Sequence, residues 1–419
     1  MSLDLLSSTS RVETPFIIAE MAGVSFGIYN TTSKEVILNN SQYNSIVATY
    51  PNFMKSLEVT KINGTVNTYT LQMTYAITAG DDPNLLEKIF SKIKKDRTMY
   101  LSYGDLSMPN YIYKKEEVLV TKIRSNVSFD GSQINYTISA VSKSLQASAG
   151  NYSFGKRVAK PSDVIKELLY NNKYGLLDIF YGMRDREKTL LNNLIASDDA
   201  TVTIQAKSNI SLIKYLEYLV QCMVPSTSNL NSILKSSVYK ISIYDDILGD
   251  FEGPYFKVSK VSSNIIKDTL NVYEINIGYP DASMVMDFSI DDDEVFSILY
   301  DYAGNVNQPQ YIQRIDNKGN LISEYSPTLS SSSNLMITTE QDKTWWTNMT
   351  SFPIKTTLKL KGLLKPTILM SYIYLDVRFY GQKHYSSGYY VITKQQDSIS
   401  AQGFRTTLSL LKVGGDNDN

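Results

Sequence analysis

The sequence is poorest in the two residues on which most metal and redox chemistry depends. Its 419 residues include one cysteine, Cys222, and one histidine, His384. A lone cysteine cannot form an intrachain disulfide, which excludes the oxidised scaffold of small secreted domains. Zinc sites take most of their ligands from cysteine and histidine, and two such residues far apart in sequence cannot supply a set. We therefore expect no metal site.

Signatures of cofactor binding and of membrane insertion are also missing. The sequence contains neither a P-loop nor a dinucleotide-binding fingerprint. Its longest apolar stretch, 212–224, includes Lys214, Glu217 and Gln221 and is shorter than the roughly 20 residues that span a bilayer as a helix. Residues 1–7 lack the basic region and apolar core of a signal peptide. We expect no catalytic residue, no cofactor and no membrane anchor.

Neither sign of charge is in excess. Lysine and arginine total 41 and aspartate and glutamate total 42, which gives a net charge of −1 at pH 7. Proteins that bind nucleic acid tightly carry a surplus of basic residues that neutralise phosphates, and polybasic membrane anchors need the same surplus. The balance therefore disfavours both functions. The hydrophobic fraction of 42% is enough to bury several cores.

The residues that are abundant favour β-structure. The 31 tyrosines suit the pleated, half-buried surface of a sheet. Asn63-Gly64 and Asp130-Gly131 are strong hairpin signals, because both central positions of a type I′ turn have positive φ. Apolar and polar residues alternate over 66–77, which predicts a strand with one wet face. With a helix predicted at 82–95, residues 16–150 form an antiparallel β-unit with a packed helix.

The middle of the chain has a different pattern, and the end is again β-rich. Helical spacing follows a helix-start cluster at 161–163 and recurs at 185–196 and 210–223. Strands return afterwards. Alternating residues over 354–361 and through 372–412 predict a closing meander of four strands.

These patterns predict a mainly β protein of the α+β class, with two antiparallel β-barrel domains, packed helices and a mixed α/β insertion. Both ends of the chain combine strands, hairpins and a short helix, which suggests an internal duplication, although no repeat of fixed period is present. The predicted division is a mobile N-terminus at 1–15, a first barrel at 16–150, a mixed α/β domain at 151–245, a β-rich connecting domain at 246–330, a second barrel at 331–412 and a mobile C-terminus at 413–419.

Three features that could carry chemistry are interpreted as structural, and a fourth stays open. The acidic run 291–294 lacks the spacing of a calcium loop and suits a solvated turn. No evident nucleophile accompanies His384, and Cys222 follows an apolar helical stripe as a small buried residue. The pair Trp345-Trp346 could bind a sugar or a partner, or fill the base of the second β-unit.

Residues 280–412 resemble a known family. The pattern runs from a glycine before a strand, through a hairpin that contains the histidine, to the last two strands. Its positions are Gly362, Gly381, His384, Ser387, Gly388, Tyr390, Asp397, Gly403, Thr407 and Leu408. They look like the closing β-barrel of baseplate hub proteins from contractile-tailed bacteriophages and related contractile injection systems. Over 1–150 the resemblance is one of architecture.

The resemblance implies a structural virion protein of the tail baseplate, assembled in the host cytoplasm, and not an enzyme. Hubs of this kind are homotrimers in which each chain contributes two tail-tube-like barrels, so that three chains form a pseudo-six-fold ring. The implied partners are the tail spike below, the tail tube or a tube-initiator protein above, the tape-measure protein and baseplate wedge components. DNA only passes through the channel during genome ejection, and a near-neutral chain is consistent with a channel that does not hold it.

Two alternatives stay open. A β-rich receptor- or glycan-binding tail protein would present tyrosine and tryptophan surfaces to sugars. A tail-tip cell-wall hydrolase would need a pair of carboxylates, and the 42 acidic residues leave such pairs available although no local pattern points to one.

Overall fold

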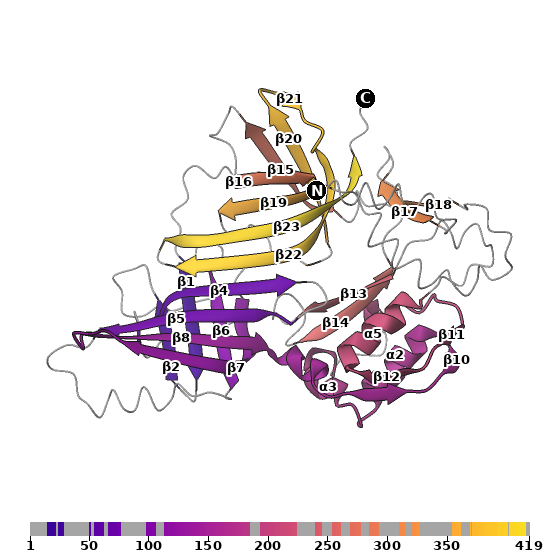
Figure 1. The fold of residues 1–419 in the computed structure, drawn as a ribbon, viewed down its shortest axis with the longest axis horizontal. Coiled ribbons are helices and arrows are strands. Elements are labelled where there is room, and N and C mark those ends of the chain that lie inside the picture. The colour runs from indigo at the N-terminus through magenta and orange to yellow at the C-terminus, as the bar shows by residue number, and fades with distance from the viewer. Residues whose placement is uncertain are drawn as a thin grey trace, which may run out of the picture.

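The computed structural model is a β-rich chain whose described helices are grouped in one region (Figure 1). The structure describes residues 15–21, 24–28, 50–51, 54–62, 66–76, 98–105, 113–184, 193–223, 239–244, 254–260, 269–277, 285–292, 310–315, 321–326, 354–361, 369, 371–400 and 402–415. The predicted β-rich class is confirmed. Of the mobile ends predicted at 1–15 and 413–419, Pro15 begins a strand and residues 413–415 end one; the rest of both ends and the helix expected at 82–95 lie outside these ranges.

One large, mostly antiparallel sheet of 15 strands dominates the fold. Its main path runs β16-β19-β23-β22-β4-β5-β8-β7-β6-β1-β2-β3, with β15, β20 and β21 joined beside β22. We call the N-terminal strands the first β-unit: β1 (Pro15–Met21), β2 (Val24–Ile28), β3 (Tyr50–Pro51), β4 (Met54–Ile62), β5 (Thr68–Ala76), β6 (Thr98–Asp105), β7 (Tyr113–Val127) and β8 (Gln133–Ser142). The second β-unit comprises β15 (Thr269–Ile277), β16 (Val285–Asp292), β19 (Ile354–Lys361), β20 (Tyr372–Phe379), β21 (Gln382–Lys383), β22 (Gly388–Ser400) and β23 (Gly403–Gly415).

The first β-unit has the hairpins that its sequence predicts. β4 and β5 pair antiparallel on either side of Asn63-Gly64. β7 and β8 pair around a turn in which Gly131 has a φ of +69°. Every second side chain of β5 from Tyr69 to Met73 is buried, so the predicted alternation sets which face of the strand meets the core.

The second β-unit differs from the predicted meander. β19 pairs with β23 instead of β20, β20 pairs with the N-terminal half of β22, and β15 runs parallel to β20. The long β22–β23 hairpin offers two edges, and the alternation in β19 and β20 suits either of them. With the observed pairing, Leu358 lies opposite Leu408 in one buried core. β17 (Gln310–Ile315) and β18 (Leu321–Ser326) pair antiparallel as a separate two-stranded sheet.

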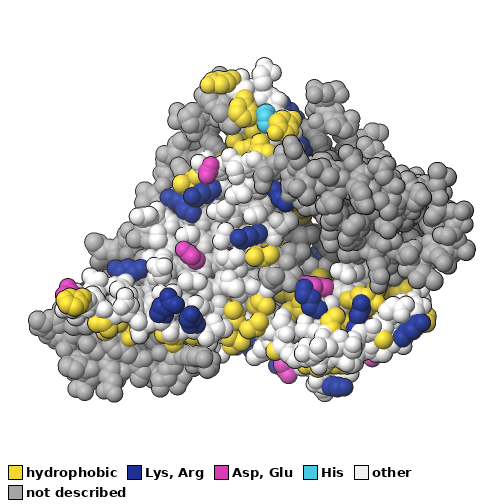
Figure 2. Space-filling model, in the orientation of Figure 1, with side chains coloured by type: hydrophobic (Ala, Val, Ile, Leu, Met, Phe, Trp, Pro, Cys, Tyr) yellow, Lys and Arg dark blue, Asp and Glu magenta, His cyan; other side chains and the backbone are white. Residues whose placement is uncertain are grey.

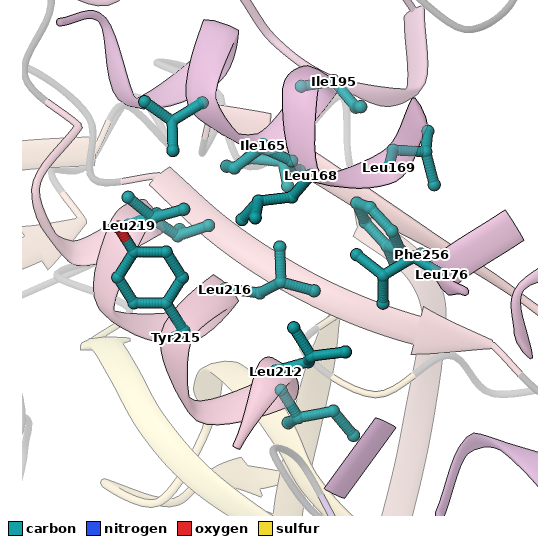
Figure 3. Close-up of a cluster of buried hydrophobic side chains, with 14 of the residues drawn as sticks. Ile165, Leu168, Leu169, Leu176, Ile195, Leu212, Tyr215, Leu216, Leu219 and Phe256 are labelled. Atoms are coloured by element: carbon teal, nitrogen blue, oxygen red, sulfur yellow. The ribbon is translucent and has the colours of Figure 1, made fainter. Parts of the chain in front are cut away.

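The sequence predicts a mixed α/β domain at 151–245. The described residues between 143 and 260 combine helices with short strands and lie beside the first β-unit (Figure 1). Helices α2 (Pro161–Tyr170) and α5 (Leu212–Gln221) pack through leucine- and isoleucine-rich faces, with Leu168 near Leu216 (Figure 3). The remaining elements are η3 (Lys143–Ser148), β9 (Tyr152–Phe154), β10 (Arg157–Ala159), α3 (Leu176–Ile179), η4 (Tyr181–Met183), β11 (Val202–Ile204), β12 (Lys207–Ile210), β13 (Tyr239–Tyr244) and β14 (Tyr255–Lys260).

The helix starts have clear local causes. Pro161 occupies the first turn of α2, where its missing N–H costs nothing. The buried Asp199 carboxylate accepts hydrogen bonds from both the N–H and the hydroxyl of Ser162, at 2.9 and 2.5 Å. Ser211 caps α5 by accepting from the Lys214 N–H. Of the predicted helix at 185–196, the described part is helical at 193–194, and Ile195 then forms a bridge to Val258.

Candidate assembly interface

The two β-units are joined edge to edge by β22 and β4. These strands pair antiparallel from Lys394 opposite Ile62 to Ser400 opposite Ser56, and they lie side by side at the centre of Figure 1. Ile399 and Leu57 face each other across this junction, and both are completely buried in the core of the first β-unit. The hydrophobic core therefore crosses the junction, and it couples the two units more tightly than backbone hydrogen bonds alone would.

A buried polar network lies on the β22 side of the junction. One oxygen of the Asp397 carboxylate accepts from the Thr406 hydroxyl at 2.7 Å, and the other accepts from the Gln395 amide at 2.7 Å. All three residues are buried. A buried carboxylate is tolerated only where donors replace the lost water, so these donors fix how β22 lies against β23.

A second buried polar group approaches from the β4 side. Lys61 lies directly opposite Gln395 in the strand register. Its ammonium nitrogen is 3.9 Å from a Glu116 carboxylate oxygen and 4.3 Å from the centre of the Tyr113 ring. The Tyr103 hydroxyl donates to the same carboxylate at 3.2 Å. The apolar pattern of β4 gives no sign of a buried lysine, so the sequence analysis missed this group.

The two β-units repeat the same pairing scheme. The order β4-β5-β8-β7 in the first corresponds to β16-β19-β23-β22 in the second. β7 pairs with β8 along one edge and with β6 at the start of the other edge, as β22 pairs with β23 along one edge and with β20 at the start of the other. The expectation of internal duplication thus has a topological counterpart in the described strands.

The repeat extends to individual side chains. The register of β7 shifts between Val120 and Lys122, and that of β22 shifts between Ile392 and Lys394. At each bulge a threonine hydroxyl donates to a serine carbonyl on the next strand: Thr121 to Ser139 at 3.1 Å, and Thr393 to Ser409 at 3.0 Å. The local sequences at the two bulges, V-T-K and I-T-K, are similar and reflect the duplication. They lie too far apart in the chain to appear as a repeat of fixed period.

Five of the predicted family-motif residues lie together at the tip of the second β-unit. Tyr380 and Gly381 both have positive φ, as a type I′ turn between β20 and β21 requires. The Ser387 hydroxyl donates to the Val377 carbonyl and accepts from the Val377 N–H, each at 3.0 Å. The buried Tyr390 hydroxyl donates to the Ser386 carbonyl at 2.5 Å, and burial raises its pKa to about 12. The group comprises Gly381, His384, Ser387, Gly388 and Tyr390.

The other motif residues lie away from this tip. Asp397 belongs to the junction network, Gly403 opens β23 with a φ of +127°, and Leu408 is in the core of the second β-unit beside the half-buried Thr407. Gly362 lies outside the described residues. The nine described positions thus do not form one site: five lie at the tip, and of the other four Asp397 belongs to the network at the junction.

His384 is packed among aromatic rings at the tip. Its ring lies 4.7 Å from that of Phe379 and 4.2 Å from that of Tyr385, and the cyan histidine of Figure 2 sits among yellow side chains. Nδ1 is 2.7 Å from the Ser386 hydroxyl. Burial, together with the Lys412 ammonium, holds the pKa of the His384 imidazole below its ordinary value. The neutral ring therefore acts as a packing and hydrogen-bonding group.

Other candidate sites have structural explanations or lie outside the described residues. Cys222 is buried at the end of α5, as expected. Ser25 has the G-x-S-x-G spacing of a nucleophile elbow at 23–27, which the sequence analysis missed. It lies within β2 opposite Glu20, whereas an elbow needs a strand-to-helix turn. Residues 291–292 of the acidic run end β16. Residues 293–294 of the run and the pair Trp345-Trp346 lie outside the described residues.

The described residues provide neither a cluster of metal ligands nor a membrane-spanning helix. No group of three or more histidine, cysteine, aspartate or glutamate side chains there could hold a metal ion. No helix within the described part of the chain has the length and hydropathy needed to cross a membrane.

Solved structures of three tail proteins superpose on most of this chain. A tail protein from Neisseria meningitidis superposes with a TM-score of 0.50 at 8% sequence identity, covering 95% of this chain and 96% of that one. The 43 kDa tail protein of prophage MuSo2 from Shewanella oneidensis gives 0.49 at 9% identity, covering 96% and 97%. A prophage tail protein from Listeria monocytogenes gives 0.42 at 10% identity, covering 94% of each chain. No protein-family model matches the sequence, and no curated protein matches it.

The match to the Neisseria tail protein extends over almost the whole of both chains, so the two share a fold from end to end. At this level of identity the likeness concerns the fold.

Proposed function

We propose that the protein is a structural component of a phage tail, the central hub of the baseplate, and that it has no enzymatic role. Three copies form a ring that joins the six-fold tail tube above to the three-fold spike below. The ring encloses the channel for the tape-measure protein and DNA, and baseplate wedge components surround it. Each chain contributes two tube-like barrel domains, the two β-units.

The observation that carries the proposal is the duplicated β-unit with its edge-to-edge junction. A chain that presents two equivalent units side by side gives a three-fold assembly six similar positions, which is what a ring between six-fold and three-fold partners needs. The end-to-end likeness to a Neisseria tail protein supports the tail as its location. The completely buried Ile399 and Leu57 favour a rigid element that transmits force.

Negative-stain electron microscopy of the purified chain, alone and mixed with its candidate spike, tests the proposal. We expect a three-fold ring with a central hole and a pseudo-six-fold outline. Compact monomers in both samples would overturn it. Glycan binding by those monomers would then favour the receptor-binding alternative, and release of peptidoglycan fragments would favour the hydrolase.

A further inference from the structure

Among the edges of the large sheet that no described strand covers, two belong to the duplicated strands β7 and β16. Beyond Val120, β7 pairs with β8 on one side, and no described strand pairs with its other side. Within the described part of the chain, β16 pairs with β19 alone and ends the main path of the sheet. An edge of this kind presents a row of N–H and C=O groups that another strand can complete.

The internal duplication identifies the partner of each edge. Inside the chain, β22 of the second unit pairs with β4 of the first. Since β7 corresponds to β22 and β16 to β4, the equivalent junction joins β7 of one copy to β16 of another. We propose that copies of this chain associate by antiparallel pairing of these two edges, an inference that rests on the proposed function because it names the contact that closes the ring.

The bulges fix the register of this pairing. In the alignment of β7 with β22, Thr121 corresponds to Thr393, since each lies at a register shift. In the alignment of β16 with β4, Val285 corresponds to Met54, since a register shift follows each of them. Transferring the observed pairs Gln396–Thr60, Ser398–Glu58 and Ile399–Leu57 then gives the pairs between copies. They are Arg124 with Asp291, Asn126 with Ser289, and Val127 with Phe288.

Charge supports this register. Residues 121–127 of β7 include Lys122 and Arg124 and no acidic residue, whereas β16 includes Asp287, Asp291 and Asp292 and no basic residue. Opposite charges on facing strands stabilise a pair, and like charges oppose two copies of the same edge. The two edges are therefore complementary to each other and unsuited to self-pairing.

Burial supports it as well. Val127 is 56% exposed, although the equivalent Ile399 is completely buried by the junction inside the chain. Phe288 is only partly buried against the core of the second β-unit, whereas the equivalent Leu57 is completely buried. The proposed pairing places Val127 beside Phe288 and extends the core between copies. Because the two edges differ, the contact is head-to-tail, which generates a closed ring when the rotation between copies closes.

Site-directed cross-linking tests the register. In a Cys222→Ser background, one preparation carries Asn126→Cys and another carries Ser289→Cys. The two are co-refolded in equal amounts and treated with a short bis-maleimide. We expect a covalent dimer on denaturing gels from the mixture and none from either variant alone. Gln133→Cys on the neighbouring strand β8, mixed with Ser289→Cys, is the matched control and should give none.

Charge reversal gives a second measurement on the folded protein. Arg124→Asp and Asp291→Arg should each weaken association about tenfold in analytical ultracentrifugation, and the double variant should regain most of it. Circular dichroism checks that each variant folds. If rings assemble, but residues 126 and 289 do not cross-link and neither charge reversal weakens association, the β7–β16 pairing is wrong. The proposed hub function would still stand in that case. A cross-linked dimer in a sample that never forms rings would support the pairing and contradict the hub.

Discussion

Asp397 is a carboxylate with almost no access to solvent, and its two oxygens depend on different donors. Replacing it with alanine leaves the Gln395 amide and the Thr406 hydroxyl buried without this acceptor. We expect Asp397→Ala to lower the free energy of unfolding by about 2–4 kcal/mol, measured by urea denaturation. Gln396→Ala, an exposed position on the same strand, should change it by less than about 0.5 kcal/mol. Equal effects of the two substitutions would contradict a role for the network.

His384 can be followed without ambiguity because it is the sole histidine. Burial and Lys412 favour its neutral form, so the unfolded chain binds a proton more readily than the folded chain. The stability from this group is therefore complete above its ordinary pKa of 6.5 and is lost as the pH falls through that value towards the lowered one. Proton NMR of the ring should show a midpoint below 6.5, and Lys412→Met should raise it. A midpoint at 6.5 or above would contradict the packing described here.

At the scale of the element, the two bulges provide a matched pair. Thr121 and Thr393 make the same hydrogen bond, but Thr393 is partly buried at the junction and Thr121 is exposed. We expect Thr393→Val to lower the free energy of unfolding by about 1 kcal/mol, and Thr121→Val to lower it by less, because water replaces the lost partner there. Denaturation of both variants checks the order, and the reverse order would mean that burial does not govern these bonds.

The elements that the sequence predicts well are those fixed by neighbouring residues. Asn63-Gly64 and Gly131 set their hairpins through the φ angles of the turn, and Pro161 sets the start of α2. Pairing between distant strands was not predictable in this way. The alternation of β19 fits either edge of the β22–β23 hairpin, and nothing near β4 indicates that it meets β22.

The candidate interface was predicted only in pieces for the same reason. Asp397 and Leu408 were singled out through the family resemblance, whereas Lys61, Gln395 and Glu116 were not. A buried ion pair between β4 and β7 forms only when strands far apart in sequence come together, so local periodicity cannot indicate it.

At the scale of the whole molecule, one side chain from the second β-unit completes the core of the first. Ile399→Ala should lower the free energy of unfolding by about 3 kcal/mol and also separate the melting of the two units in calorimetry. Leu410→Ala, inside the core of the second unit, is the control: a similar loss of stability without separation of the transitions. A single unchanged transition in Ile399→Ala would show that the shared core does not couple the units.

The junction also has a consequence for the order in which the protein is made. Thr60 on β4 meets Gln396 on β22, 336 positions later in the chain. During synthesis the edge of β4 therefore stays uncovered until the 336 positions that lead to Gln396 have been made. An open edge is a template for aggregation, and contacts between distant residues form slowly. β22 is the strand that covers this edge, so a chain released before β22 is made is expected to need a chaperone most.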